Sequence, residues 1–76
     1  MKTQIVLIPV DNESDGRKIA ERIESQKYSS ISEILEEFPE EERESIIIHE
    51  LTDFMDLCNN QELNLESVWV SYVNLI

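Results

Sequence analysis

The chain has 76 residues, 41% of them hydrophobic, with 17 acidic against six basic side chains, so its formal net charge at pH 7 is −11. The length predicts one domain spanning residues 1–76, and the apolar content exceeds that of a disordered acidic tail. A negative charge of this size repels nucleic acid and anionic lipid and attracts basic surfaces. We therefore predict no direct binding of nucleic acid and no membrane binding.

The first predicted element is a strand. Residues 5–10 form an apolar, β-branched run whose two alternating faces are both apolar, the pattern of a strand covered on both sides. Pro9 lacks an amide donor, which predicts that the end of this strand lies at an edge or leaves the sheet. The polar stretch 11–16 then makes a turn. A helix is predicted over residues 14–26, with a buried stripe of Ile19, Ala20 and Ile23.

A second, shorter helix is predicted to begin at residue 31. The sequence Ser30-Ile31-Ser32-Glu33 fits a capping box, with Ser30 as the N-cap and Glu33 at the third helical position. Apolar residues recur at helical spacing as far as Phe38, and Pro39 ends the helix.

Residues 39–59 allow two interpretations. The first is one long helix, because a proline followed by three glutamates is a favourable helix start and apolar side chains in the second half share one face. The second is a strand over residues 45–50, because three consecutive isoleucines favour extended structure. In that case Thr52 caps a separate helix over residues 53–59. We favour the second interpretation, since the first turns of a long helix would bury no side chain.

Residues 68–76 are predicted to form the last strand. The whole order is then β–α–α–β–α–β, a small α+β domain, or small α/β domain, with a three-stranded sheet; the long-helix interpretation leaves two strands. The last strand is apolar on both faces, and three short helices can hardly cover both faces of the sheet. Because monomers rarely expose a large apolar face, we predict a homodimer or a partner docked on the sheet. The residues expected to mediate self-association are Trp69, Val73 and Leu75.

Two short motifs resemble metal sites. Residues 11–16 match the opening of a calcium loop, but Arg22 stands where the bidentate acid is due, which favours a helix-capping turn. The sequence His49-Glu50-Leu51-Thr52-Asp53 resembles the zinc-protease pattern HExxH, with aspartate in place of the second histidine. Because the chain has one histidine and no evident third ligand, we predict no metal site, no cofactor and no catalytic residue. A metal-dependent enzyme using His49, Glu50 and Asp53 is kept as an alternative.

The last third of the chain carries a resemblance. The segment Leu51-Thr52-Asp53-Phe54-Met55-Asp56-Leu57-Cys58-Asn59-Asn60-Gln61-Glu62, followed by Trp69-Val70-Ser71-Tyr72-Val73, resembles small uncharacterised acidic proteins of Bacteroides-type bacteria and their mobile elements. In those proteins an L-[ST]-[DE]-F helix start and an acidic, Asn-containing helix end precede a final strand W-[IV]-x-Y-V. The resemblance implies a short helix opening at Thr52 and no assigned activity. In size and charge the chain also resembles phage and plasmid inhibitors of host defence, including anti-CRISPR proteins.

The single cysteine, Cys58, excludes an internal disulfide and suits a reducing compartment. We expect its thiol in the core. The apolar run near the N-terminus is too short to span a membrane and is followed by acids where a signal peptide would need small neutral residues. We therefore predict a soluble, cytoplasmic protein.

The acidic side chains are concentrated in one stretch, which is the candidate site. Residues 28–76 hold 12 acids against one base, and six of these acids lie between residues 36 and 44. We predict a non-enzymatic interaction protein that binds a basic protein surface, in the sharpest version an inhibitor that imitates nucleic acid in the groove of a nucleic-acid-binding protein. The alternative is a regulatory or housekeeping module of a mobile element whose acidity only aids solubility. The predicted partner-binding residues are Glu36, Glu37, Glu40, Glu41, Glu42, Glu44, Asp53 and Asp56.

Overall fold

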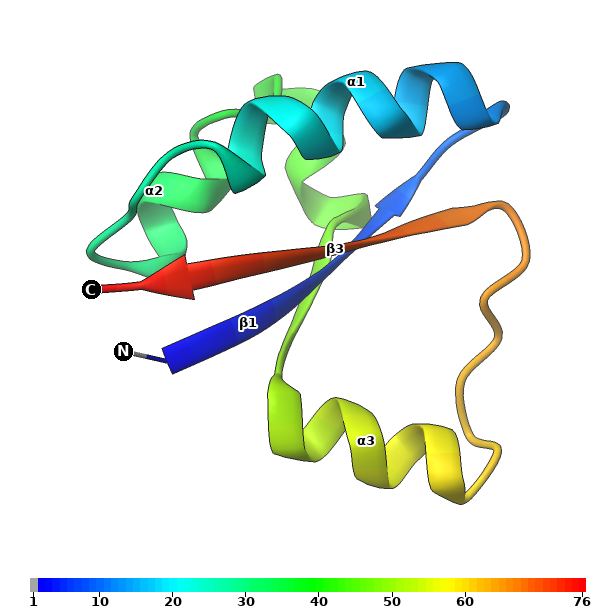
Figure 1. Cartoon of the computed structure of the whole chain (residues 1–76). Coiled ribbons are helices and arrows are strands. Elements are labelled where there is room, and N and C mark those ends of the chain that lie inside the picture. The colour runs from blue at the N-terminus through cyan, green and yellow to red at the C-terminus, as the bar shows by residue number, and fades with distance from the viewer. Residues whose placement is uncertain (1) are drawn as a thin grey trace.

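The computed structural model describes residues 2–76 (Figure 1). In chain order the elements are β1 (Lys2–Pro9), α1 (Glu13–Glu24), α2 (Ile31–Leu35), the 3-10 helix η1 (Glu40–Ser45), β2 (Ile47–Glu50), α3 (Leu51–Asn59) and β3 (Val68–Leu75). The predicted α+β class and the predicted order are confirmed, with η1 added between α2 and β2. The alternative of one helix over residues 39–59 is wrong, because the isoleucine run extends into a strand.

The sheet has the order β2-β1-β3, and both pairings are antiparallel. The first strand is therefore the central one, which explains why it is apolar on both faces. The short strand β2 pairs only with Gln4–Leu7, whereas β3 pairs along the whole of β1 as far as Pro9. Pro9 thus pairs with β3 alone, in agreement with the predicted alternative that this end of the strand lies at an edge.

Each face of the sheet is packed against helices (Figure 1). On one face, Val6 and Ile8 of β1 join Val73 of β3 and the buried side chains of α1 and α2 in the larger core cluster. On the other face, Ile5 and Leu7 pack against Phe54 of α3. The Cα radius of gyration is 12.0 Å, close to the roughly 11 Å expected of a compact domain of this length.

Helix α1 begins with a side-chain cap and lies very close to β3. Asn12 is the N-cap, and its Oδ1 accepts a hydrogen bond of 2.9 Å from the backbone N–H of Asp15. The calcium-like stretch is therefore the start of a helix, as its capping interpretation predicts. Gly16 faces Trp69, and a Cβ built on this glycine would lie 2.9 Å from three side-chain atoms of that tryptophan. The absence of a side chain at Gly16 permits this approach.

Helix α3 differs from the prediction at its start. It begins at Leu51, its N-cap is Glu50 without a side-chain hydrogen bond, and Thr52 lies inside the helix. The predicted capping role of Thr52 is wrong, because β2 runs directly into α3 with no intervening turn. The helix ends in a Schellman motif around Gln61, a non-glycine residue with a φ of 57°.

The outer edge of β3 is partly occupied by groups from elsewhere in the chain. The backbone N–H of Tyr72 donates to Glu24 Oε1 of α1 over 3.4 Å, and the N–H of Ile76 donates to the carbonyl of Tyr28 over 3.0 Å. These contacts satisfy edge groups that would otherwise be open to pairing with another strand. Among residues 2–76, no helix has the length and apolar character needed to cross a membrane.

Candidate functional site

The acidic segment, defined as residues 36–44, follows α2 and includes most of η1. Helix α2 starts as the capping box predicts: the N–H of Glu33 donates to Ser30 Oγ over 3.4 Å. The Glu33 carboxylate also accepts from the hydroxyl and the N–H of Ser29 over 2.7 and 2.5 Å. These hydrogen bonds hold the pKa of Glu33 below its ordinary value of 4.5. The segment therefore follows a helix with a well-defined start.

Arg43, the only base in residues 28–76, fixes the acidic segment to α2. Its Nε donates to the carbonyls of Leu35 and Phe38 over 3.0 and 3.1 Å. Leu35 is the last residue of α2, and Phe38 follows three residues later within the acidic segment. Arg22 of α1 adds a second attachment, because one of its terminal nitrogens donates to the carbonyl of Glu37 over 2.9 Å. The two arginines thus hold the backbone of the segment and leave most of its carboxylates unpaired.

The glutamates of η1 point in different directions, because side chains three positions apart lie on the same side of a 3-10 helix. Glu42 and Ser45, three positions apart, both line a pocket beside α1. The remaining glutamates of η1, which are Glu40, Glu41 and Glu44, are exposed to solvent, as is Glu36. Among residues 2–76, Glu37 is the only one of the six glutamates in an ion pair, with its Oε2 3.7 Å from Arg22 Nε. The segment therefore presents five exposed, unpaired carboxylates on a fixed backbone.

Asp53 and Asp56 do not join this surface. Both are exposed on α3, which packs against the opposite face of the sheet from α1 and α2 (Figure 1). The predicted partner-binding set is therefore divided between two sides of the molecule. One rigid partner surface cannot contact both parts without reaching around the sheet, so we restrict the candidate site to the acidic segment and its surroundings.

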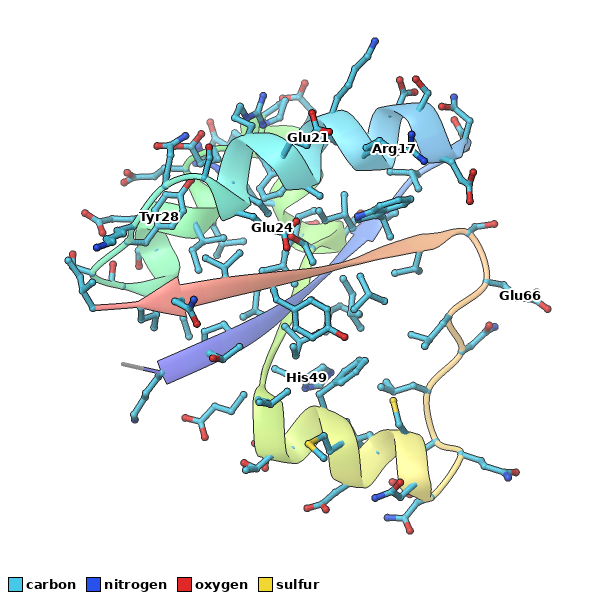
Figure 2. The ribbon with its side chains drawn as sticks, viewed as in Figure 1. Arg17, Glu21, Glu24, Tyr28, His49 and Glu66 are labelled. Carbon is cyan, nitrogen blue, oxygen red and sulfur yellow. The ribbon has the colours of Figure 1, made fainter. Side chains whose placement is uncertain are left out.

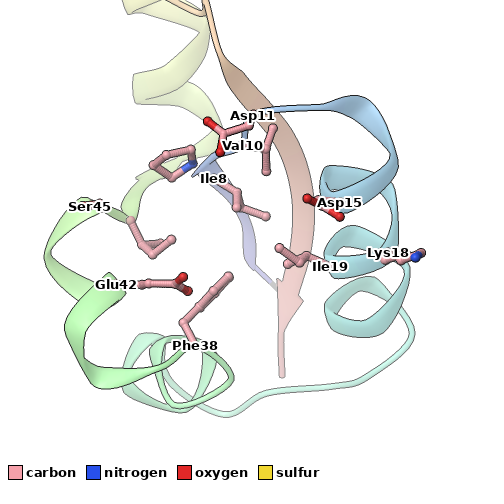
Figure 3. Close-up of a pocket in the computed structure, with 11 residues that line it drawn as sticks. Ile8, Val10, Asp11, Asp15, Lys18, Ile19, Phe38, Glu42 and Ser45 are labelled. Carbon is pink, nitrogen blue, oxygen red and sulfur yellow. The ribbon is translucent and has the colours of Figure 1, made fainter.

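The pocket beside η1 has a volume of about 470 Å³. Its apolar lining comes from β1, α1, α2 and β2 and their connections, while carboxylates come from opposite walls. Figure 3 shows Asp15 of α1 and Glu42 of η1 directed toward the space between them, with Asp11 above and Lys18 directed outward. The apolar lining residues are Ile8, Pro9, Val10, Ile19, Phe38 and Ile46.

Sequence reasoning did not predict this pocket. Asp11 and Asp15 belong to the neutral N-terminal part of the chain, far from the acidic segment in sequence. Only the packing of α1 beside η1 brings them near Glu42. The one local signal was the capping pattern around Asn12, which fixes where α1 starts and hence which way Asp15 points.

The residues predicted to self-associate lie on the helix-covered face. Val73 is 1% exposed in the core beneath α1, while Trp69 and Leu75 are half-buried and pack against the same cluster. The premise that this face is bare is wrong, because α1 and α2 cover it. The large apolar side chains that stay exposed around the sheet and α3 include Ile47 at 50% and Tyr72 at 52%.

The arrangement required by the HExxH-like pattern is also absent. His49 and Glu50 belong to β2, whereas Asp53 belongs to α3, so the three do not share one helical face. Figure 2 shows His49 on the α3 side of the sheet, and its side chain is half-buried. Within residues 2–76, no group of three or more His, Cys, Asp or Glu side chains is arranged to hold a metal ion.

Comparison with known proteins adds no further guide to this site, since no family model, curated protein or solved structure matches the chain.

Proposed function

We propose that this chain is a non-enzymatic interaction protein that binds a basic protein surface through its acidic segment. The observation that supports this proposal is the attachment of the segment by Arg43 and Arg22, which use their donors on backbone carbonyls. A segment that served only solubility would need no such attachment. Among residues 2–76, the exposed carboxylates of Glu36, Glu40, Glu41, Glu42 and Glu44 form no ion pair and are available to an outside partner.

A fixed backbone makes such a surface more effective than a mobile acidic tail. Ordering a flexible segment on binding costs conformational entropy, and a segment that is already ordered avoids much of this cost. Each exposed ion pair contributes about 0.2–1 kcal/mol, so affinity must come from several carboxylates acting together. The field of the whole chain, with its net charge of −11, speeds encounter with a basic partner, and salt weakens this effect.

Nucleic-acid-binding proteins are the partners to test first, because they carry the densest basic grooves. In this sharper version the chain occupies such a groove and acts as an inhibitor inside the cytoplasm, where Cys58 stays reduced. The alternative is a regulatory module whose acidity is incidental. In that case no partner should bind in a way that depends on these carboxylates. The same experiment separates the two.

The experiment compares two variants with equal loss of charge. In the first, Glu40, Glu41 and Glu44 on the exposed side of η1 are replaced by glutamine. In the matched control, Asp53→Asn, Asp56→Asn and Glu62→Gln remove three exposed carboxylates on or just after α3. Each tagged protein captures partners from host lysate at low and high salt, and the captured proteins are identified by mass spectrometry.

We expect a basic partner that binds at low salt and is released at high salt. Three lost ion pairs weaken its binding to the η1 variant roughly 3- to 150-fold, while the α3 control keeps its affinity. Equal weakening in both variants would show that only total charge matters. The proposal would be contradicted if no basic protein is captured, or if the η1 variant captures the same partner as strongly as the wild type does.

A further inference from the structure

The apolar pocket between α1 and η1 is next to the proposed binding surface and has its own chemistry. We infer that it receives a single arginine side chain from the basic partner; this inference rests on the proposed function and specifies the contact at its centre. Its volume of about 470 Å³ falls within the roughly 300–1,000 Å³ typical of sites for small ligands.

The apolar lining suits the stem of an arginine. Phe38, Ile8 and Ile19 contribute apolar surface inside the pocket, and Figure 3 shows all three directed toward its interior. Arginine carries a three-carbon stem that packs on apolar surface while its charged end reaches polar groups. A purely polar cation, such as a hydrated metal ion, would leave this apolar surface unused.

The charges of the pocket select a cation. Three carboxylates line it, those of Asp11, Asp15 and Glu42, against the one ammonium of Lys18. Lys18 points away from the interior in Figure 3, so it does not neutralise the carboxylates across the pocket. An anionic ligand would be repelled, and a neutral apolar ligand would remove water from the carboxylates without replacing it. A guanidinium with five donors in one plane can hydrogen-bond to carboxylates on opposite walls.

The position of the pocket links it to the acidic segment. Glu42 faces the pocket while Glu41 and Glu44, on the same 3-10 helix, face solvent. A basic partner segment lying along η1 therefore meets exposed carboxylates on one side and can place one side chain into the pocket on the other. In interfaces, a buried arginine of this kind often carries much of the binding energy.

The test uses a small probe and the whole chain. Nα-acetyl-arginine amide has no carboxylate of its own and is titrated into ¹⁵N-labelled protein, with amide chemical shifts as the readout. The citrulline analogue has nearly the same shape without the charge, and the lysine analogue has the charge without the planar group. The pocket variant is Asp15→Asn with Glu42→Gln; the control is Glu41→Gln with Glu44→Gln, which removes equal charge from the solvent side of η1.

With the arginine probe we expect saturable shifts of the amides around the pocket. The lysine probe should bind at least about tenfold more weakly, and the citrulline probe should not bind. The pocket variant should bind the arginine probe at least about tenfold more weakly, whereas the control should bind it as the wild type does. All four substituted glutamates and aspartates are exposed, and thermal melting verifies that both variants fold.

The inference is overturned if the shifts are scattered over the acidic surface, if citrulline binds equally well, or if the control variant loses binding as the pocket variant does. Failure of this inference is distinct from failure of the proposed function. If the arginine probe does not bind in the pocket but the η1 substitutions still abolish capture of a basic partner, the proposed function holds and only the pocket inference fails. Binding of arginine in the pocket with no basic protein captured would leave a site for a small guanidinium compound.

Discussion

The replacement of Gly16 by alanine tests the packing on which the larger core depends. Gly16 lies in α1, and the chain has no glycine with a positive φ among residues 2–76, so its role is steric rather than conformational. The added Cβ would lie 2.9 Å from Cβ, Cδ2 and Cε3 of Trp69. Because one of these atoms is the Trp69 Cβ itself, rotation of the indole does not relieve the clash. Helix α1 and strand β3 must move apart.

The magnitude follows from two opposing effects. Carbon atoms in good contact are about 3.5–4.0 Å apart, so three contacts at 2.9 Å are each too short by about 0.6–1.1 Å. Overpacking of this kind costs typically about 1–3 kcal/mol. Alanine in a helix interior gains up to about 1 kcal/mol over glycine. We expect Gly16→Ala to destabilise the chain by about 1 kcal/mol, which lowers the melting temperature by about 4–8 °C for a domain of this size.

Urea unfolding measures this change, with far-UV circular dichroism for the fold and fluorescence of the single tryptophan for the contact. The variants Glu21→Ala and Glu21→Gly, at an exposed position of the same helix, give the propensity difference alone. Gly16→Ala should be less stable than the wild type, while Glu21→Ala should be more stable than Glu21→Gly. A Gly16→Ala protein that gains the same stability as the Glu21 pair would refute the steric argument.

Four further predictions concern stability and are measured by chemical or thermal unfolding. Ser71 is fully buried and its hydroxyl has no hydrogen-bond partner among residues 2–76, so Ser71→Ala should raise the free energy of unfolding by about 1 kcal/mol; a loss of stability would indicate a hidden partner. Gln61→Gly should stabilise by about 1 kcal/mol, because glycine adopts the left-handed conformation found there (φ 57°) without the steric cost of a side chain. Arg43→Met removes the donor to the carbonyls of Leu35 and Phe38 and should cost about 2 kcal/mol; an unchanged stability would show that other contacts hold the acidic segment. Glu33→Gln should lower the melting temperature at neutral pH only. The lowered pKa of Glu33 stabilises the folded state above its ordinary value of 4.5, and this contribution is lost as pH falls through the lower folded value, so variant and wild type should converge in acid.

The secondary structure follows largely from local patterns in the sequence. The capping box at Ser30 precedes α2 as predicted, and the isoleucine run leads into β2, which begins at Ile47 rather than at residue 45 because η1 extends to Ser45. Trp69, Val73 and Leu75, which were grouped in the sequence, do share one face of β3, since side chains alternate along a strand. The start of α3 was misplaced because Thr52 has the composition of a cap, whereas the direct passage from β2 leaves that role to Glu50.

The predictions that failed depend on how elements approach one another. The sequence predicts an uncovered sheet face, because three short helices offer little surface to cover both faces of the sheet. Because Gly16 has no side chain, α1 packs directly against Trp69. This close packing helps a short helix to cover the face of the sheet. Cys58 was expected in the core but is exposed, because the packing of α3 on the sheet centres on Phe54 and Leu51 near its start. The pocket could not be predicted for the same reason, since its walls come from separate parts of the chain.

The pairing of β1 with β3 has a consequence for how the protein is made. The central strand, residues 2–9, pairs along its whole length with residues 68–75. Forming this half of the sheet therefore closes a loop that spans nearly the whole sequence given. Contacts of such long range slow folding, because the entropy of loop closure is lost before the pairing compensates it. During synthesis the apolar strand β1 is therefore made well before β3 and stays unpaired with it until the ribosome has added residues 68–75. The nascent chain depends in that interval on its own negative charge, or on a chaperone, to keep that strand from aggregating.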